Sequence, residues 1–258
     1  MIKIEAISIL QDNYVWAVHN GHSAILVDPG DAAPILAWLR NRDMTARAIL
    51  VTHHHYDHVG GIAGLLEHAP IPVFGPTRGA AKTQPVADGE TLNFPDMGVD
   101  FKVIETPGHT LDHVCYVADT SPATPLHLFC GDTLFSCGCG RLFEGSPAEM
   151  YASLTRLAQL PDNTKVCCAH EYTLANIAFA LEAEPANQAL LDRHVEALAL
   201  RKQGAATLPV SMGQERSSNP FLRCDLPALV VAASQHVKNP LKPGAETFAA
   251  IRAWKDEA

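Results

Sequence analysis

The sequence predicts an α/β protein, with sheets covered by helices in a first domain and helices alone in a second. Short β-branched runs separated by turn residues recur over roughly the first two thirds of the chain. Helical spacing of apolar residues appears between several of these runs, and beyond residue 172 most of the chain reads as helix. We therefore expect a mixed domain over residues 1–172 and a helical C-terminal domain over residues 173–258.

The first domain mixes strands and helices along the chain. Its strand candidates are apolar runs at residues 2–9, 14–19, 23–28, 48–52, 101–106, 113–118, 126–132 and 165–170. Its helix candidates lie at residues 33–42, 61–68 and 147–160. Pro147 suits the first turn of the last of these helices, where a missing N–H costs nothing. Several strands in succession, mixed with helices, favour sheets that pack against helices.

The second domain reads differently. From Thr173 to Gly204 the helical pattern is nearly continuous, broken at Pro185 and ended by Gly204. A Pro-punctuated stretch follows, and residues 244–258 predict a last helix.

Composition excludes several classes of partner. The chain has 258 residues, a formal net charge of −9 and no run of Lys or Arg longer than two, so nucleic acid and anionic membranes are not expected as partners. The N-terminal residues do not show the pattern of a secretory signal, so none is expected, and no apolar run approaches the ~20 residues of a membrane span. Seven cysteines without C-x-x-C pairs fit a reducing compartment. We expect a cytoplasmic protein and take a monomer as the expectation.

The stretch THHHYDHVGG holds four histidines and an aspartate in six consecutive positions. In an extended segment His53 and His55 point to one side and His54 to the other. The chain then turns into a helix, which places Asp57 and His58 at a strand-to-helix junction. This arrangement suits two neighbouring metal ions better than one.

Further ligands are expected at the ends of other strands, and His109, Asp132 and His170 each close a β run. Imidazole and carboxylate together suit Zn, Fe or Mn. Taken singly, His170 reads more often as a hydrogen-bonded or solvent-facing side chain, and Asp132 as a turn or N-cap residue.

Other interpretations of these residues stay open at this point. The histidine stretch could be a solvated, tag-like segment. Cys137 and Cys139 in SCGCGR could form a thiolate site, although small reduced residues in a loop are the simpler interpretation. The remaining histidines read as surface or packing residues; they include His19, His22, His54, His68, His127, His194 and His236.

The pattern T-H-x-H-x-D-H, followed by a later His, Asp and His, resembles the metallo-β-lactamase superfamily, whose fold is an αββα sandwich. The chain further resembles glyoxalase II, the hydroxyacylglutathione hydrolases, over essentially its whole length. The matching motifs are QDNYVW, VDPGD, TPGHT, FCGDTLFSCGCGRLFEG, AHEYTLAN, RSSNPFLR and AIRAWKDEA. The GCGR loop, NPFLR and the Arg-x-x-Lys ending are far more specific than the histidine motif.

The resemblance implies two divalent metal ions, with zinc expected first and iron or manganese as alternatives. The implied ligands are His53, His55 and His109 for one ion, Asp57, His58 and His170 for the other, and Asp132 as the bridge. It also implies hydrolysis of S-D-lactoylglutathione to D-lactate and glutathione, the second step of methylglyoxal detoxification. The implied nucleophile is a metal-bridging hydroxide, with Asp57 and Asp132 as the catalytic carboxylates.

Glutathione thioesters are anionic, so an acidic protein must bring local cations to the site. Arg141 is expected to do so, and Arg252 and Lys255 lie one turn apart on the last predicted helix and share a face. Tyr172 is a further expected contact to the peptide part of glutathione. Phe143 stands where some relatives carry a Tyr that contacts the glutathione backbone, so this hydrogen bond should be missing. Without the resemblance, the two cations would read as a solvated helix surface.

Four other functions compete with this one. A persulfide dioxygenase of the same superfamily, with a single iron, is the main alternative; the nearly complete second ligand set argues against it. A β-lactam hydrolase lacks the expected export signal, and a nuclease does not suit the acidic balance. A metal-binding module without enzymatic activity is the fourth.

Overall fold

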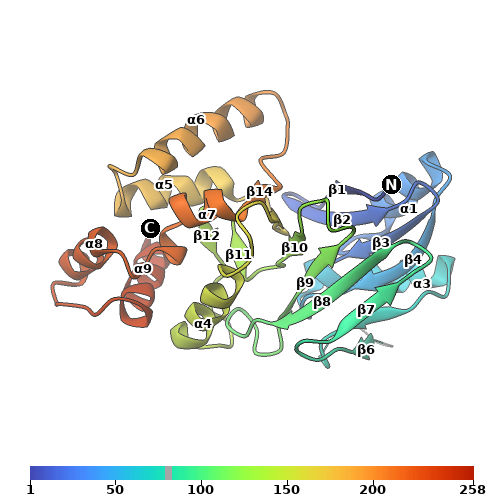
Figure 1. The fold of residues 1–258 in the computed structure, drawn as a ribbon, viewed down its shortest axis with the longest axis horizontal. Coiled ribbons are helices and arrows are strands. Elements are labelled where there is room, and N and C mark those ends of the chain that lie inside the picture. Colours follow the sequence, from blue (N-terminus) through green and yellow to red (C-terminus); the bar gives the residue numbers. More distant parts are fainter. Residues whose placement is uncertain (79–82) are drawn as a thin grey trace. The chain divides into compact units, whose positions relative to one another are not determined.

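The computed structural model describes residues 1–78 and 83–258, and the chain divides into two compact units (Figure 1). Unit 1 comprises Met1–Glu105, Asp112–Gly131 and Cys167–His170. Unit 2 comprises Thr106–Leu111, Asp132–Val166 and Glu171–Ala258. Each unit is thus assembled from several chain segments, and the domain boundary expected after residue 172 stays a prediction.

The first sheet of unit 1 follows the chain in order. Its strands are β1 (Lys3–Ile9), β2 (Asn13–His19), β3 (Ser23–Val27), β4 (Thr45–Leu50), β5 (Val73–Gly75) and β6 (Thr83–Pro85), in the order β1-β2-β3-β4-β5-β6. β1, β2 and β3 pair antiparallel, whereas β3 to β6 pair parallel. β2 is buried along its whole length, as expected for an inner strand covered on both faces.

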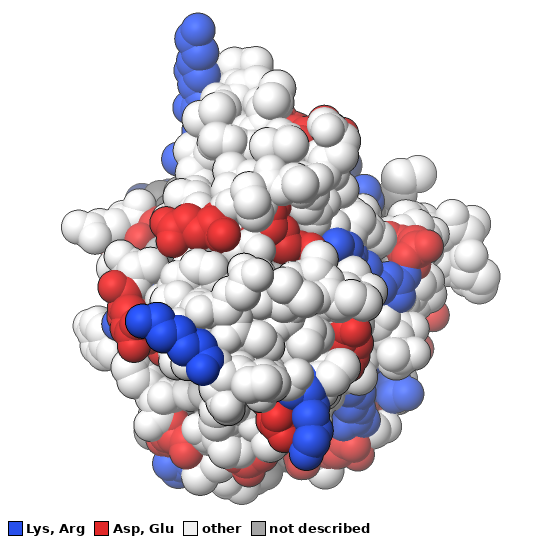
Figure 2. Space-filling model, turned by 90° about the vertical axis from the view of Figure 1, so that its left-hand side faces the viewer, with Lys and Arg blue, Asp and Glu red and all other residues white. Residues whose placement is uncertain are grey.

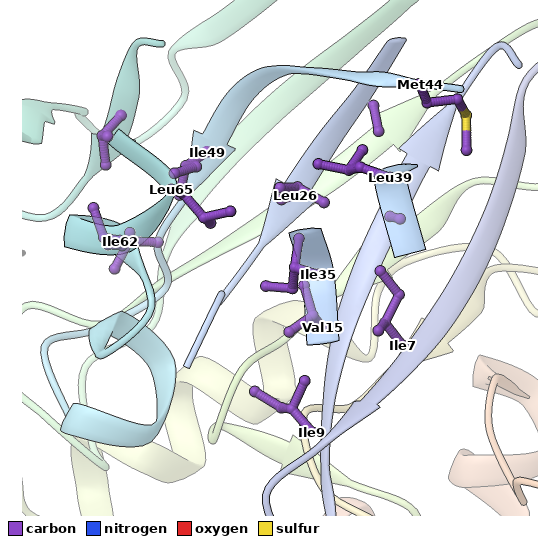
Figure 3. Close-up of a cluster of buried hydrophobic side chains, with 14 residues drawn as sticks. Ile7, Ile9, Val15, Leu26, Ile35, Leu39, Met44, Ile49, Ile62 and Leu65 are labelled. Atoms are coloured by element: carbon purple, nitrogen blue, oxygen red, sulfur yellow. The ribbon is translucent and has the colours of Figure 1, made fainter. Parts of the chain in front are cut away.

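Helices cover the outer face of this sheet. α1 (Ala32–Asn41) starts at Asp31, whose carboxylate accepts a hydrogen bond from the Ala33 N–H at 3.0 Å. α1 and α3 (Ile62–His68) bury apolar side chains against the sheet, in the cluster drawn in Figure 3. Each such fully buried aliphatic side chain contributes about 1.5–3 kcal/mol of transfer free energy. The short helix α2 (Tyr56–Val59) precedes α3.

A second, antiparallel group of strands completes unit 1. It contains β7 (Thr91–Phe94), β8 (Val99–Glu105), β9 (Val114–Asp119) and β10 (His127–Phe129), in the order β10-β9-β8-β7. The Tyr116 hydroxyl on β9 donates to the Val51 carbonyl at 2.8 Å, and the Trp16 and Phe129 rings lie 6.5 Å apart. The two groups of strands therefore face each other across an aromatic and aliphatic core.

Unit 2 is mainly helical. Its elements are β11 (Leu134–Phe135), β12 (Gly138–Cys139), α4 (Pro147–Leu157), β13 (Lys165–Cys167, of which Cys167 belongs to unit 1), α5 (Thr173–Ala183), α6 (Gln188–Lys202), β14 (Val210–Ser211), α7 (Met212–Ser218), η1 (Pro220–Leu222), α8 (Pro227–Val237) and α9 (Ala245–Glu257). α9 packs on both α4 and α8, and α5 packs on α6. Ser146 and Glu149 form a capping box at the start of α4, with Pro147 in the first turn as predicted.

Most predicted elements are confirmed, with bounds shifted by a few residues. The helix predicted from Thr173 to Gly204 is two helices, broken around Pro185 as expected. The strands β5, β6 and β7 were missed because each has only three or four residues, too few for a periodic pattern. α8 was missed because Pro227, read as punctuation, instead opens the helix.

The surface and the helices agree with the composition. On the face drawn in Figure 2, acidic and basic side chains are interspersed, and the described residues there form no continuous basic patch. Within residues 1–78 and 83–258, no helix is both long and apolar enough to cross a bilayer.

Candidate functional site

The histidine stretch leaves β4 in extended geometry and then turns into α2. His55 is the N-cap residue of α2, with extended backbone angles. His53 Nε2 and His55 Nδ1 lie 3.1 Å apart, whereas His54 turns toward Asp112, 3.6 Å away. The alternation predicted for an extended segment is therefore observed.

Asp57, His58 and His170 converge within unit 1. Asp57 Oδ2 lies 3.4 Å from His58 Nε2 and 3.3 Å from His170 Nε2. One ligand atom from each of these residues lies within 4.8 Å of the others, so together they could hold a metal ion. His170 reaches this point because the Tyr14 N–H donates to the Ala169 carbonyl at 2.7 Å, which ties the end of β13 to β2.

Carboxylates hold the outer nitrogens of two of these imidazoles. His58 Nδ1 lies 3.0 Å from Asp28 Oδ2, and His170 Nδ1 lies 2.8 Å from Asp12 Oδ1. A carboxylate accepts, so each Nδ1 carries the proton and each Nε2 keeps its lone pair for the common point. This is the orientation that metal-binding histidines adopt, and the residues present therefore fit a metal ion.

His53 is oriented in the same way through a hydroxyl. The Thr52 hydroxyl donates to Asp28 Oδ2 at 2.7 Å and therefore accepts from His53 Nδ1, 3.1 Å away. His53 Nε2 is thus the atom left for a ligand role.

Asp57 is held as a carboxylate. Burial by itself raises the pKa of Asp57, but the polar side chains around it, those of His170, His58 and Asn13, outweigh that effect and hold the pKa well below its ordinary value. The Asn13 amide donates to Asp57 Oδ2 at 2.9 Å. An anionic oxygen beside neutral imidazole nitrogens is the donor set that divalent metals of the Zn, Fe and Mn class prefer.

Two glycines let the ligand-bearing turn pack tightly. A Cβ on Gly30 would lie 1.8 Å from the Asp57 carbonyl oxygen, and one on Gly60 would lie 2.8 Å from the Gly30 carbonyl oxygen. The VDPGD and HVGG motifs therefore let the backbone segments approach each other closely, which sets the position of α2 and its ligands.

His109 and Asp132 come together within unit 2. His109 Nε2 lies 3.5 Å from Asp132 Oδ2, and His109 Nδ1 donates to the Arg141 carbonyl at 2.8 Å. The carbonyl can only accept, so Nε2 again keeps its lone pair. A Cβ on Gly140 would lie 1.9 Å from the Asp132 carbonyl oxygen, which explains the glycine in the GCGR loop.

A cavity of about 390 Å³ in unit 2 contains both of these ligand candidates. Its lining includes the sequence-predicted residues His109, Asp132, Arg141, Phe143, Tyr172, Arg252 and Lys255. It also includes Phe135, Cys139 and Asn176, which were not predicted. Residues separated by more than 100 positions in the chain thus form one concave surface.

Two of the three cations in this cavity are firmly held. Arg252 is 3% exposed, donates to the Cys139 carbonyl at 3.1 Å and to Asp256 at 2.9 Å, and lies over the Phe221 ring. The Lys255 ammonium contacts the Asn176 side-chain oxygen. Burial lowers the pKa of Lys255 to about 8, so the ammonium loses part of its charge in mildly alkaline solution.

The remaining lining residues differ in exposure and in chemical character. The Arg141 side chain is largely exposed, with Nε 3.7 Å from Asp256. Phe143 is exposed, and its ring meets His109 edge-on at 5.3 Å. Tyr172 packs against Phe135 at the start of α5. Phe143 therefore gives this side of the cavity an apolar surface with no hydroxyl.

Cys137 and Cys139 do not behave as a thiolate pair. Both are buried, and burial raises the pKa of each thiol, that of Cys137 to about 12. Among the described residues, the groups suited to a metal ion contain His and Asp but not Cys. The simpler interpretation, small reduced residues in a loop, agrees with these facts.

Sequence reasoning gave no role to several residues that support the site. Asp12 and Asn13 lie in QDNYVW, and Asp28 lies in VDPGD. Both motifs contribute to the family resemblance, but no function was predicted for these residues. Their polar residues stand next to apolar strands, which was the available signal. Asn176 closes another motif of the resemblance, AHEYTLAN, but it lies inside a helical pattern and does not stand next to an apolar strand.

Two protein-family models match the chain. The model of the metallo-beta-lactamase superfamily covers residues 10–170, and that of the hydroxyacylglutathione hydrolase C-terminus covers residues 171–258. A hydroxyacylglutathione hydrolase of Nitrosomonas eutropha is 48% identical over an alignment of 258 positions that covers 99% of this chain and 99% of the relative. One of Cupriavidus taiwanensis is 47% identical, with 99% of each chain covered.

Solved structures show the same fold. The B3 metallo-beta-lactamase BLEG-1 is 24% identical, with a TM-score of 0.64, over 85% of this chain and 99% of its own. TTHA1623, crystallised in a di-iron-bound form, is 25% identical, with a TM-score of 0.59, over 85% of this chain and 100% of its own. The predicted fold class, a metallo-β-lactamase fold with a helical C-terminal part, is confirmed.

Proposed function

Because this chain belongs to the hydroxyacylglutathione hydrolases of the metallo-β-lactamase superfamily, we propose that it cleaves S-D-lactoylglutathione to D-lactate and glutathione. One observation carries this proposal beyond the family. The cavity of unit 2 brings two metal-ligand candidates, His109 and Asp132, into the same space as three cations. A site for an anionic thioester needs both features.

The proposed metal site uses the seven residues predicted from the sequence. They are His53, His55 and His109 for one ion, Asp57, His58 and His170 for the other, and Asp132 shared between them. The carboxylate and hydroxyl partners that orient the imidazoles support this assignment, as does the di-iron-bound form of TTHA1623. We propose zinc as the natural metal, with iron or manganese as alternatives.

Divalent ions, when bound, supply a water that is activated near neutral pH and polarise the thioester carbonyl. The chain itself binds and orients the substrate. Arg252, Lys255 and Arg141 attract the carboxylates of the glutathione part, while His109 and Asp132 mark the reacting end of the cavity. The leaving thiolate is a modest base, so the proposal assigns no general acid.

The proposal further expects a cytoplasmic monomer that acts on a small molecule, without nucleic acid or membrane as a partner. All seven cysteines are buried and reduced, which suits a reducing compartment. Light scattering of the purified protein and fractionation of cells would test these two expectations.

The decisive experiment measures thioester loss by ultraviolet absorbance together with metal content. Wild type should hydrolyse S-D-lactoylglutathione, and His55→Ala should lose activity by about a hundredfold or more with part of its metal. His54→Ala is the matched control, because this neighbouring histidine turns away toward Asp112. The proposal would be refuted if the wild-type protein, loaded in turn with zinc, iron and manganese, showed no thioesterase activity with any of them.

The alternative function, a single-iron persulfide dioxygenase, predicts oxygen uptake with glutathione persulfide. The family model of the hydroxyacylglutathione hydrolase C-terminus favours the hydrolase. Two metal equivalents and no oxygen uptake are the results that we expect.

A further inference from the structure

A short hairpin forms part of the cavity wall in unit 2. β11 and β12 pair antiparallel over residues 134–139, and Phe135 and Cys139 of this hairpin line the cavity. Asp132 precedes the hairpin and Arg141 follows it. A shift of the hairpin would therefore displace the wall and both of these site residues.

Glu215 of α7, which is fully buried, holds the turn of the hairpin. One of its carboxylate oxygens accepts from the Ser136 hydroxyl at 2.9 Å, and the other accepts from the Cys137 N–H at 2.9 Å. Cys137 has a φ of 56°, a left-handed conformation that is unfavourable for a residue other than glycine. The two hydrogen bonds thus offset the conformational cost of this turn.

Asn219, also fully buried, holds the two strands of the hairpin. Its side-chain nitrogen lies 3.1 Å from the Phe135 carbonyl, 2.9 Å from the Gly138 carbonyl and 2.9 Å from Glu215. Its side-chain oxygen accepts from the Phe221 N–H at 3.0 Å, which fixes the amide by both ends. The RSSNPFLR motif, so far without a function, therefore acts on the hairpin.

Two cations of the cavity are connected to the same hairpin by hydrogen bonds. Asn176 donates to the Ser136 carbonyl at 3.0 Å, and its side-chain oxygen meets the Lys255 ammonium. Arg252 donates to the Cys139 carbonyl at 3.1 Å. The positions of both cations thus depend on where the hairpin lies.

We propose that Glu215 and Asn219 are positioning residues for the glutathione part of the substrate. They act as a buried clamp on residues 134–139, and through Asn176 and the Cys139 carbonyl they set the spacing of Lys255 and Arg252. Neither clamp residue lines the cavity, so the clamp acts on substrate only through the hairpin. This inference rests on the proposed function, because it takes glutathione as the ligand of the cavity.

The test compares Glu215→Gln with Glu184→Gln, a matched variant of the same unit. Glu184 is also buried and accepts hydrogen bonds from Arg223 at 2.9 and 3.0 Å and from Asn187 at 3.3 Å, partners that lie outside the hairpin. The glutamine amide at position 215 keeps the side-chain volume but replaces one accepting oxygen with an N–H group that can only donate. Melting temperature, KM, kcat and the dissociation constant of glutathione itself are measured for each variant.

Glu215→Gln should raise KM and the glutathione dissociation constant about tenfold, with kcat changed less than about threefold. Glu184→Gln should lower the melting temperature comparably while KM stays within about twofold of wild type. Equal KM values for Glu215→Gln and wild type would overturn the clamp, and so would an equal rise of KM in both variants.

A milder variant covers the case in which Glu215→Gln does not fold. Ser136→Ala removes one hydrogen bond of the clamp and should raise KM about threefold. An unchanged KM in this variant would also overturn the inference. The clamp is tested by comparing the glutathione dissociation constants of variant and wild type, which does not require hydrolysis. A wild type that binds glutathione but hydrolyses no thioester would therefore refute the proposed function and leave the clamp standing.

Discussion

The ligand group of unit 1 and the cavity of unit 2 differ in the sign of the charged side chains that surround them. In unit 1, carboxylates surround the imidazoles, with Asp12 behind His170 and Asp28 behind His58. In unit 2, cations line the cavity, and Lys255 is held by the neutral Asn176 amide. The first arrangement suits a metal cation, and the second suits an anionic ligand.

This difference lets the two regions be disturbed separately. Changes among the ligands and their carboxylate partners should alter metal content and kcat. Changes among the cations of the cavity should alter KM, because they remove ground-state binding. The predictions below use that separation, from the largest expected effect to the smallest.

Asp132→Ala should have the largest effect, because it removes the shared ligand of the proposed site. We expect kcat/KM to fall by about a thousandfold and metal content to drop. Activity assays with metal analysis measure both. Asp162→Ala, an exposed aspartate of unit 2 paired with Arg216, is the control. Full activity of Asp132→Ala would break the assignment of unit 2 residues to the metal site.

Arg252→Ala combined with Lys255→Ala should raise KM by about a hundredfold and lower kcat far less, because two charge-assisted contacts to glutathione are lost. Steady-state kinetics give both values. Lys242→Ala, an exposed lysine outside the cavity, should leave KM unchanged. An unchanged KM in the double variant would remove the cations from substrate binding.

Asp12→Asn should weaken metal binding by about tenfold or more, because the carboxylate no longer fixes the His170 ring. Titration with a chelator measures this affinity. The control is Asp112→Asn, since Asp112 faces His54, which is not a predicted ligand. If both variants lost metal equally, the carboxylate next to a predicted ligand would matter no more than one next to another histidine, and the proposed role of Asp12 would be wrong.

KM should rise with pH above about 8, because Lys255, with its pKa lowered to about 8 by burial, loses its charge there. Below that pH the ammonium is charged and binds the anionic substrate. The fully lost charge would raise KM by about tenfold. Lys255→Arg stays charged and should flatten the profile of KM against pH. A profile identical in both proteins would assign the pH effect to another group.

Phe143→Tyr should have the smallest effect, a KM lowered by about two- to fivefold through one added hydrogen bond to the glutathione backbone. Its kcat should stay unchanged, since the added hydroxyl is expected to contact the glutathione backbone and not the metal ligands. Phe143→Leu, which removes the aromatic ring without adding a hydroxyl, is the control. A lower KM in Phe143→Leu would show that the ring, rather than the missing hydroxyl, limits binding.

Local patterns in the sequence predicted the ligand stretch well. His53, Asp57 and His58 lie within six positions, so the extended-to-helix geometry of a single segment is enough to bring them near one another. Gly60 belongs to the same stretch and allows a close backbone approach that any side chain would block.

Support from distant residues could not be predicted in the same way. Asp12 meets His170 across 158 positions, and Arg252 meets Cys139 across 113. Glu215 lies in the Pro-punctuated stretch for which no helix was predicted, and only its burial and its partners reveal the clamp. Periodicity reports which face of an element is apolar, but it does not report which element that face will meet.

The sequence by itself determined the fold class, the family and the candidate ligands, because these depend on local periodicity and on motifs of fixed spacing. Tertiary structure alone decided which carboxylate holds which imidazole, how the cations are held in the cavity, and that Glu215 and Asn219 hold a hairpin. The physical reason is range. A hydrogen bond is formed only within about 3 Å, and residues far apart in the chain come that close only after the chain has packed.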